Sequence, residues 1–189
     1  MMRPLALCPG CGRASPGGRR HPDCKGALDA LIAPLPYAQP LIRDAIKHYK
    51  YHGVLALEPF ILSQAAVAAR AQRTLFPVAP TVVPLPLHAS RERERGFNQA
   101  ERIGRAVADE LGGAMINPLR RVRRTDHQAE LSTRERLENC TDAFACDAVS
   151  GDVVLIDDVV TTGATMQAAA RALKDAGARS VTGFALAHG

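Results

Sequence analysis

The stretch VVLIDDVVTTGAT, at residues 153–165, decides the fold class of this chain. Its first four residues are apolar, which is typical of a parallel strand buried on both faces. Two adjacent carboxylates, Asp157 and Asp158, follow that strand. A short turn rich in hydroxyl groups comes next and leads into a helical pattern. Ligands of open α/β sheets bind just outside the carboxyl ends of the strands, so this order predicts a ligand site.

The turn at residues 161–165 has the composition of a phosphate site. Backbone N–H groups at the start of a helix lack intrahelical partners and carry the positive end of the helix dipole. The residues expected to hold the phosphate are Thr161, Thr162, Gly163, Ala164 and Thr165. Carboxylates beside this turn would repel a phosphate, but they accept hydrogen bonds from vicinal hydroxyls. The stretch therefore predicts a ribose-5-phosphate clamp, with Asp157 and Asp158 on the diol. No GK[ST] follows the turn, so it is not a Walker P-loop.

Strand and helix patterns alternate along most of the chain. Apolar strands are expected at 81–85, 115–122, 153–156 and 181–187, and helical faces at 41–49, 59–75, 97–111 and 166–176. A polar stretch at 123–139 is expected to be a loop with one short helix. Apolar strands separated by helices predict an α/β fold with a parallel sheet flanked by helices.

The stretch at 153–165 resembles the signature of type I phosphoribosyltransferases that binds 5-phosphoribosyl-1-pyrophosphate (PRPP). Two further segments, VPLPLHASRERERGFNQAERIGRAVA at 83–108 and RVRRTDHQAELSTRERLENCTDAF at 121–144, are similar to the characteristic segments of the ComF family. This family serves natural competence and DNA utilisation. The resemblance implies a zinc-binding module at residues 1–30 and a phosphoribosyltransferase-like domain at 36–189, with Mg²⁺ bound together with PRPP.

The resemblance also suggests where catalytic residues lie, although it does not fix them. Arg91, Arg93 and Arg95 match the region of the pyrophosphate loop, and Arg95 is the preferred candidate, because forked Arg donors suit pyrophosphate. The alternation with glutamates also fits a solvated charged turn. The later polar stretch matches a loop that closes over PRPP, with Arg124 and Gln128 as candidates for contacts on closing. A protective basic strand edge and a track for single-stranded DNA phosphates are open alternatives for the arginines around Arg124.

Four residues near the N-terminus have the spacing of a metal site. Cys8 and Cys11 are separated by two residues, as are His21 and Cys24. Thiolates and imidazole at this spacing suit a tetrahedral zinc ion. The family pattern has a cysteine where His21 stands, and Cys₃His is itself a common zinc set. We expect structural zinc rather than disulfides in a cytosolic chain.

Composition limits the classes of function. The 189 residues carry a formal net charge of +5, which permits anionic partners. Aromatic residues make up 4% and tryptophan is absent, which argues against a stacking platform for RNA. No apolar stretch is long enough to span a bilayer and the N-terminus lacks a signal-peptide pattern, so we expect a cytoplasmic protein without a membrane partner.

Three hypotheses of function follow. In the first, the protein transfers the phosphoribosyl group of PRPP to an unknown acceptor. In the second, it is a non-catalytic competence factor that binds single-stranded DNA. In the third, it is a zinc-stabilised adaptor for a helicase or another protein of the uptake machinery. The sequence leaves open the acceptor, the oligomeric state and whether turnover occurs.

Overall fold

A seven-stranded sheet forms the centre of the computed structural model, which describes residues 5–51, 53–122 and 143–189. The strand order is β1-β2-β9-β8-β4-β5, and β3 also pairs with β9. The strands are β1 (Leu5–Ala6), β2 (Ala30–Ala33), β3 (Leu35–Pro36), β4 (Thr81–Pro84), β5 (Ala114–Met115), β8 (Gly151–Val160) and β9 (Ala178–His188). Every pairing in this sheet is parallel except that of β1 with β2. The predicted parallel sheet is confirmed.

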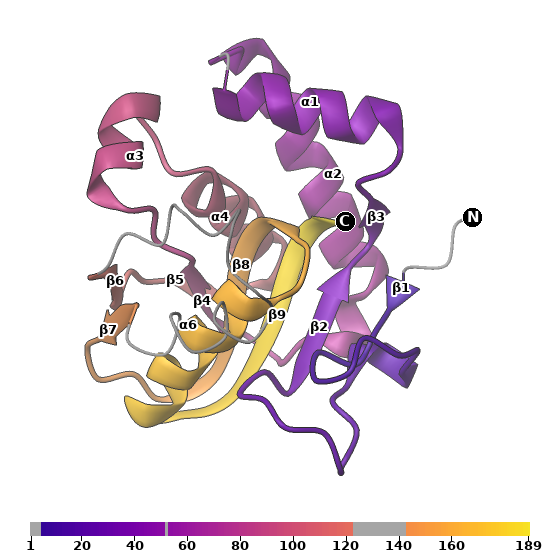
Figure 1. The fold of residues 1–189 in the computed structure, drawn as a ribbon, viewed down its shortest axis with the longest axis vertical. Helices are drawn as coiled ribbons and strands as arrows, with labels where there is room; N and C mark the ends of the chain where they lie inside the picture. The colour runs from indigo at the N-terminus through magenta and orange to yellow at the C-terminus, as the bar shows by residue number, and fades with distance from the viewer. Residues whose placement is uncertain (1–4, 52, 123–142) are drawn as a thin grey trace, which may run out of the picture.

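Helices cover both faces of the sheet. They are α1 (Pro40–Tyr51), α2 (Glu58–Ala71), α3 (Ala89–Arg95), α4 (Gln99–Leu111) and α6 (Ala164–Asp175). Figure 1 shows α6 in front of the sheet, α2 behind it, and α1 across the end at which the strand arrow of β9 terminates. Opposite placement of α4 and α6 follows from right-handed crossovers, because β4-α4-β5 and β8-α6-β9 run outward in opposite directions from the middle of the sheet.

The apolar run of β8 is buried on both faces, as its sequence predicts. Val153, Val154, Leu155 and Ile156 have no exposed surface. β8 pairs with β4 on one side and β9 on the other. Helix α6 contributes the buried Met166, Ala169, Ala170 and Leu173 to the core, and α4 contributes Ile103, Val107 and Leu111. The centre of the sheet is therefore a rigid base for the residues that follow it.

Three expectations for secondary structure were wrong in detail. The segment 115–122 is not one strand: β5 ends at Met115, and Leu119–Arg121 forms β6, which pairs antiparallel with β7 (Phe144–Cys146) in a separate two-stranded sheet. Pro118 lies between them and has no N–H group for a ladder. Helix α2 ends at Ala71 and is followed by a 3₁₀ turn, Arg73–Leu75.

The charged segment at 91–95 is also not a turn but the larger part of helix α3. His88 caps its first turn, since its side chain accepts a hydrogen bond from the N–H of Ser90. Gly96 ends the helix with a φ of 77°, a left-handed conformation that favours glycine. The cap and the glycine thus place a single short helix between β4 and α4.

Candidate functional site

The acid pair, Asp157 and Asp158, lies within the last four residues of β8. The strand runs on to Val160 because its pairing with β9 continues to His188, so the acids do not follow the strand as expected but form part of it. Each carboxylate accepts one hydrogen bond from the next backbone N–H, from Asp158 N to Asp157 Oδ1 and from Val159 N to Asp158 Oδ1, both at 2.8 Å. One oxygen of each acid is thereby fixed, and the other is left for further contacts.

Helix α1 supplies a positive charge to the acid pair. The Nζ of Lys50 lies 2.6 Å from Asp158 Oδ2, and the two side chains are 17% and 9% exposed. Burial alone would lower the pKa of Lys50, but the charges of Asp158 and Asp157 raise it. Burial and the neighbouring Asp158 carboxylate hold the pKa of Asp157 well above its usual range. The pair thus has one close ammonium group for two acids.

A cavity of about 270 Å³ opens over the acid pair; we call it the acid-pair cavity. Thr165, from the start of α6, also lines it. Four basic side chains from three parts of the fold surround it: Lys50, Arg91, Arg95 and Arg121. A space with two carboxylates at its base and cations around it suits a ligand that carries both hydroxyl groups and negative charge.

Arg95, the predicted candidate, lines this cavity from the end of α3. Its Nη1 donates to Gln99 Oε1 at 3.1 Å, and its guanidinium lies 5.0 Å from the centroid of the Tyr51 ring. Arg91 lines the same cavity, whereas Arg93 is exposed and does not. Asn98 caps α4 by accepting from Ala100 N, and its Nδ2 donates to the Leu85 carbonyl. The loop after β4 is therefore held against α4.

The TTGAT turn, residues 161–165, joins β8 to α6. Gly163 adopts a φ of 74°, and α6 begins at the next residue, Ala164. Thr161 and Thr162 are exposed, and Thr162 Oγ1 accepts from Ala164 N at 3.4 Å. The turn thus places exposed hydroxyl groups beside the N-terminus of a twelve-residue helix.

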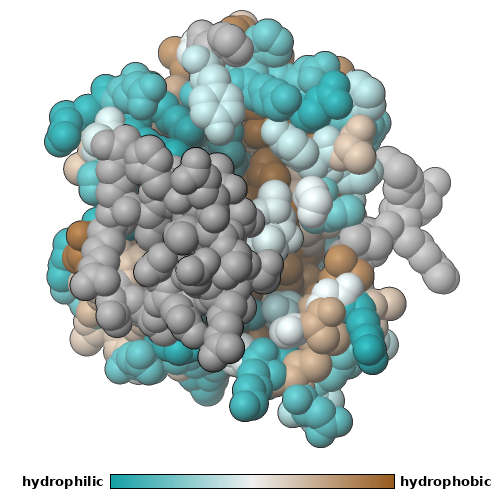
Figure 2. Space-filling model, in the orientation of Figure 1, coloured by the Kyte–Doolittle hydropathy of each residue, from teal (hydrophilic) through white to brown (hydrophobic). Residues whose placement is uncertain are grey.

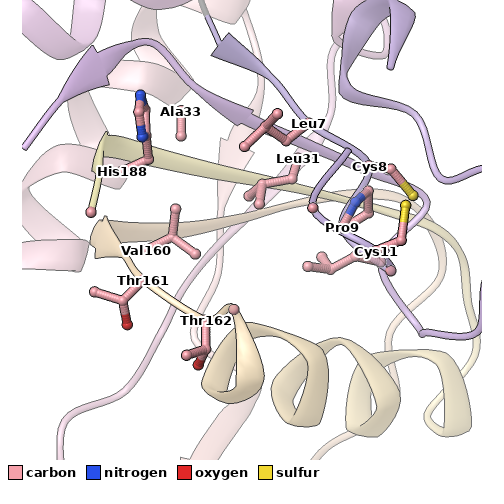
Figure 3. A pocket seen from close by; sticks show the side chains of 15 residues that line it. Leu7, Cys8, Pro9, Cys11, Leu31, Ala33, Val160, Thr161, Thr162 and His188 are labelled. Atoms are coloured by element: carbon pink, nitrogen blue, oxygen red, sulfur yellow. The ribbon is translucent and has the colours of Figure 1, made fainter. Parts of the chain in front are cut away.

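Thr161, Thr162 and Gly163 line a second cavity, of about 380 Å³, which we call the turn cavity. Figure 3 shows it between the two threonines and the segment of Cys8 and Cys11, with Val160 and His188 at the end nearest the strands. The structure thus divides the expected PRPP-binding residues: the acid pair and Thr165 line one cavity, and the first part of the turn lines the other.

Figure 2 shows hydrophilic residues over α1 and hydrophobic residues in the recess below it.

Two predicted residues cannot be placed. Arg124 and Gln128 lie outside the described residues, as do Arg123 and the polar stretch that follows it. Arg121 lies over the Phe144 ring at 5.7 Å, and Arg120 is exposed and forms an ion pair with Asp147 at 2.6 Å. Of the two described arginines in this cluster, Arg121 therefore lines the acid-pair cavity and Arg120 lies on the outer surface.

The four predicted metal ligands come together near the N-terminus. One ligand atom from each of Cys8, Cys11, His21 and Cys24 lies within 4.8 Å of the others. The Sγ of Cys11 lies 3.4 Å from His21 Nδ1, and the Sγ of Cys24 lies 3.9 Å from the same nitrogen. Three sulfurs and one imidazole nitrogen at this separation fit a tetrahedral zinc ion, so these residues could hold a metal.

The thiols of this cluster differ in acidity. Burial alone would raise the pKa of Cys8, but backbone N–H groups, with that of His21 first, lower it to about 6. The Cys11 thiol and burial raise the pKa of Cys24 to about 11. A metal ion bound by these residues would favour the thiolate of Cys24, because metals bind the deprotonated sulfur.

Gln167 connects the metal-ligand segment, residues 8–24, to the first turn of α6, which follows the TTGAT turn. It also contacts the residues just after that segment. It lies in the first turn of α6, and its Oε1 accepts from Ala27 N at 2.7 Å and from Leu28 N at 3.2 Å. Its Nε2 donates to the Pro9 carbonyl at 2.8 Å. One side chain thus satisfies three backbone groups around the metal ligands. We expect any displacement of this segment to shift the position of the first turn of α6.

The sequence did not indicate Lys50 or Gln167. Lys50 comes four residues after the buried Ile46 and so lies at the border of the buried face of α1, a weak signal in itself. Gln167 follows the TTGAT turn directly, but its partners are 140 and 158 residues away.

Comparisons with known proteins identify the family of this chain. Residues 100–188 match the model of the phosphoribosyl transferase domain. The DNA utilization protein YhgH of Salmonella typhi is 33% identical over 188 residues, which cover 94% of this chain and 82% of the relative. Competence protein ComFC of Bacillus subtilis is 29% identical, with coverage of 95% and 77%, and competence protein F of Haemophilus influenzae is 28% identical, with coverage of 80% and 69%. Among the described residues, no helix is long and apolar enough to cross a membrane. The chain belongs to the ComF family of competence and DNA utilization proteins and carries a phosphoribosyl transferase domain.

Proposed function

We propose that this protein binds PRPP with Mg²⁺ and transfers its phosphoribosyl group to an acceptor. One observation carries the proposal. The acid pair and Thr165 line a single cavity with four basic side chains, beside the N-terminus of α6. A ribose that carries a phosphate and a pyrophosphate needs such a combination, because its hydroxyl groups require acceptors and its phosphates require donors.

Each group of residues has a separate role in this proposal. Asp157 and Asp158 accept hydrogen bonds from the ribose hydroxyls. The TTGAT turn binds the 5′-phosphate through its amides and hydroxyl groups. Arg95, with Arg91 beside it, binds the pyrophosphate, and Arg124 and Gln128 remain candidates for contacts made when the loop closes.

The chemical step needs little from the protein beyond orientation and charge. A nucleophile attacks C1′ of the ribose while the bond from C1′ to the pyrophosphate oxygen breaks, and pyrophosphate leaves with the electron pair. Arginine donors stabilise the charge that develops on the leaving group. Mg²⁺ would bind the phosphate oxygens of the ligand and lower their charge, because it prefers oxygen ligands and retains several waters.

The metal-ligand segment has a structural role in this proposal. Four protein ligands leave no open position on a zinc ion, as is usual at structural sites. We expect about one zinc per chain in freshly purified protein, and elemental analysis that finds none would contradict a four-ligand site. We also propose residues 1–30 as the zinc-binding module, residues 36–189 as the phosphoribosyltransferase-like domain, and the cytoplasm as the compartment in which the thiols stay reduced.

Calorimetric titration of the protein with PRPP and Mg²⁺ tests the proposal. Replacement of the acid pair (Asp157→Ala with Asp158→Ala) should weaken binding about 100-fold or more, because buried charged acceptors are lost. Asp152→Ala is the matched control, since Asp152 lies on the same strand away from both cavities. Unchanged affinity in the double variant would remove the basis of the clamp. Release of pyrophosphate with candidate acceptors then measures turnover.

A second function is favoured by the names of the relatives, which refer to competence and DNA utilization. In this alternative the protein is a non-catalytic factor that binds single-stranded DNA or a helicase or uptake partner. Binding to DNA through Arg120, Arg121, Arg123 and Arg124 should fall steeply with salt concentration and be lost when these four are replaced. DNA binding without any affinity for PRPP would favour this function over transfer.

A further inference from the structure

We propose that Lys50 is a positioning residue of the ligand site: its ammonium group is the resident counter-charge that allows the acid pair to accept a polyanionic sugar phosphate. This inference rests on the proposed function. Lys50 lies outside residues 100–188, the part of the chain that matches the phosphoribosyl transferase domain. It comes instead from α1, which lies across the end of the sheet (Figure 1).

The position of Lys50 is fixed by its neighbour. Tyr49 is 2% exposed, and its hydroxyl donates to Glu58 Oε2 at 2.6 Å. Its ring lies 4.9 Å from that of Phe97, at the start of the α4 region. Glu58 in turn accepts from Arg102 on α4 at 3.1 Å. Because α1 is anchored to α2 and α4 at Tyr49, the next residue is held over the acid pair.

The contact with Lys50 completes the orientation of Asp158. The backbone N–H of Val159 holds one carboxylate oxygen, and the Nζ of Lys50 holds the other, at 2.6 Å. A carboxylate with both oxygens held cannot rotate, yet each oxygen has a second lone pair. Because Oδ2 is buried against Lys50, Oδ1 is the oxygen that would offer a lone pair in a fixed direction to a hydroxyl group of the ligand.

Charge gives Lys50 its second effect. The acid pair brings two carboxyl groups close together, and the proposed ligand carries phosphates that must come near them. Lys50 is mostly buried, so its attraction to Asp158 and to the ligand is only weakly screened by solvent. Without Lys50, the charge on Asp158 would be left without its close ammonium partner and would oppose the approach of phosphate.

Lys50 also touches the space that a ligand would fill. It lines the acid-pair cavity, and it lines an adjoining hollow of about 250 Å³ together with Tyr51, Arg91 and Arg95. A lysine that served only to attach α1 to the sheet would not need to face either space. The ion pair of Lys50 and Asp158 therefore lies at the edge of the space in which the ligand would bind.

A double-mutant cycle on PRPP affinity tests the inference. Lys50→Met should weaken binding about 30-fold or more, the range for loss of one partner of a buried ion pair. Lys50→Arg, which keeps the charge, should recover most of the affinity. Lys47→Met on the exposed side of the same helix is the matched control and should bind as the parent protein does. Circular dichroism establishes that each variant is folded.

The second arm of the cycle asks whether Lys50 acts through Asp158. Asp158→Asn alone should weaken binding about tenfold or more, but the same substitution added to Lys50→Met should cost less than about threefold, since it then also removes the carboxylate charge that Lys50→Met left unpaired. If Lys50→Met does not fold, the PRPP affinity of Asp158→Asn is compared with that of the double variant. Loss of Lys50 should change the affinity little once the Asp158 charge is gone, and this comparison still tests the inference.

The outcomes separate the inference from the proposed function. If the parent protein binds no PRPP, both fall. If the parent protein binds and Lys50→Met binds equally well, the inference is overturned while the proposed function stands. Independent, additive losses from Lys50→Met and Asp158→Asn would also overturn it, because the two residues would then act separately.

Discussion

The two ends of β8 carry carboxylates in opposite surroundings. At the beginning of the strand, Asp152 accepts from Arg179 Nε at 2.9 Å and from Ser180 Oγ at 2.6 Å. These bonds, with that to Arg179 first, lower the pKa of Asp152 to about 2. At the other end, burial and the Asp158 carboxylate raise the pKa of Asp157. One strand thus holds an acid that is readily ionised and another that resists ionisation.

The difference separates stability from recognition. Asp152 joins β8 to β9 across their paired ends, and its partner Arg179 is 74% exposed, so the contact is satisfied and modest in strength. The acid pair is buried beside a cavity, and among the described residues Lys50 is its one close ammonium partner. Such under-compensated charge disfavours the folded state, and perturbed carboxylates in cavities are typical of functional sites.

The largest expected effect comes from removal of the cation at each end. Lys50→Met should lower the free energy of unfolding by about 3–5 kcal/mol, because a buried carboxylate loses its partner. Arg179→Met should lower it by less than about 1 kcal/mol, because that pair is solvated. Chemical denaturation at pH 7 measures both variants. Equal losses of stability in the two variants would show that the carboxylates at the two ends of β8 depend equally on their cations, which would contradict this comparison.

The next effect concerns the two ends of α6. Gln167→Leu leaves three backbone groups near the metal ligands without their partner, and we expect a loss of about 1–3 kcal/mol together with faster extraction of metal by a chelator. Lys174→Met, near the other end of the helix, removes an ion pair with Asp29 that is partly exposed. It should cost about 1 kcal/mol or less and leave extraction unchanged. Equal extraction rates would show that Gln167 does not connect the two regions.

The sequence predicts the elements whose cause is local. The apolar run of β8, the acids inside it and the glycine before α6 follow one another in a single stretch, and the metal ligands occur as two closely spaced pairs. These patterns predicted the parallel sheet and the cluster that could hold a metal, and both are confirmed. The binding roles of the acid pair and the TTGAT turn stay predictions.

What the sequence did not predict depends on long-range contacts. β2 has only four residues and lies within a region without helical periodicity, yet it joins the sheet by pairing with β9. The ion pair of Lys50 and Asp158 forms only because α1 crosses the end of the sheet. The division of the predicted residues between two cavities also depends on long-range packing, because the segment of Cys8 and Cys11 closes one cavity and side chains from α1, α3 and β6 surround the other.

Titration of Asp157 should act on stability with the opposite sign to that of an ordinary acid. Its pKa is raised in the folded protein, so its contribution is fully present below the unfolded value near 4 and is lost as the pH rises through the raised value. Asp157→Asn removes this loss, and the variant should gain stability relative to the parent as the pH rises above about 4. Denaturation midpoints across that range measure the change, which belongs to the coupled acid pair. A constant difference between variant and parent would contradict the raised pKa.

The smallest effect is expected at the beginning of β8, and its direction is reversed. The pKa of Asp152 is lowered to about 2, so its contribution is present above its unfolded value near 4 and is lost as the pH falls toward 2. Because Arg179 is largely exposed, solvent screening limits this contribution to about 1 kcal/mol. Asp152→Asn should therefore be about 1 kcal/mol less stable than the parent at pH 7, and the two should become equal only as the pH falls through about 2. If the difference in stability instead widened as the pH fell, the pKa of Asp152 would be raised in the folded protein, as that of Asp157 is. The two ends of the strand would then not differ in how they affect the ionisation of their acids.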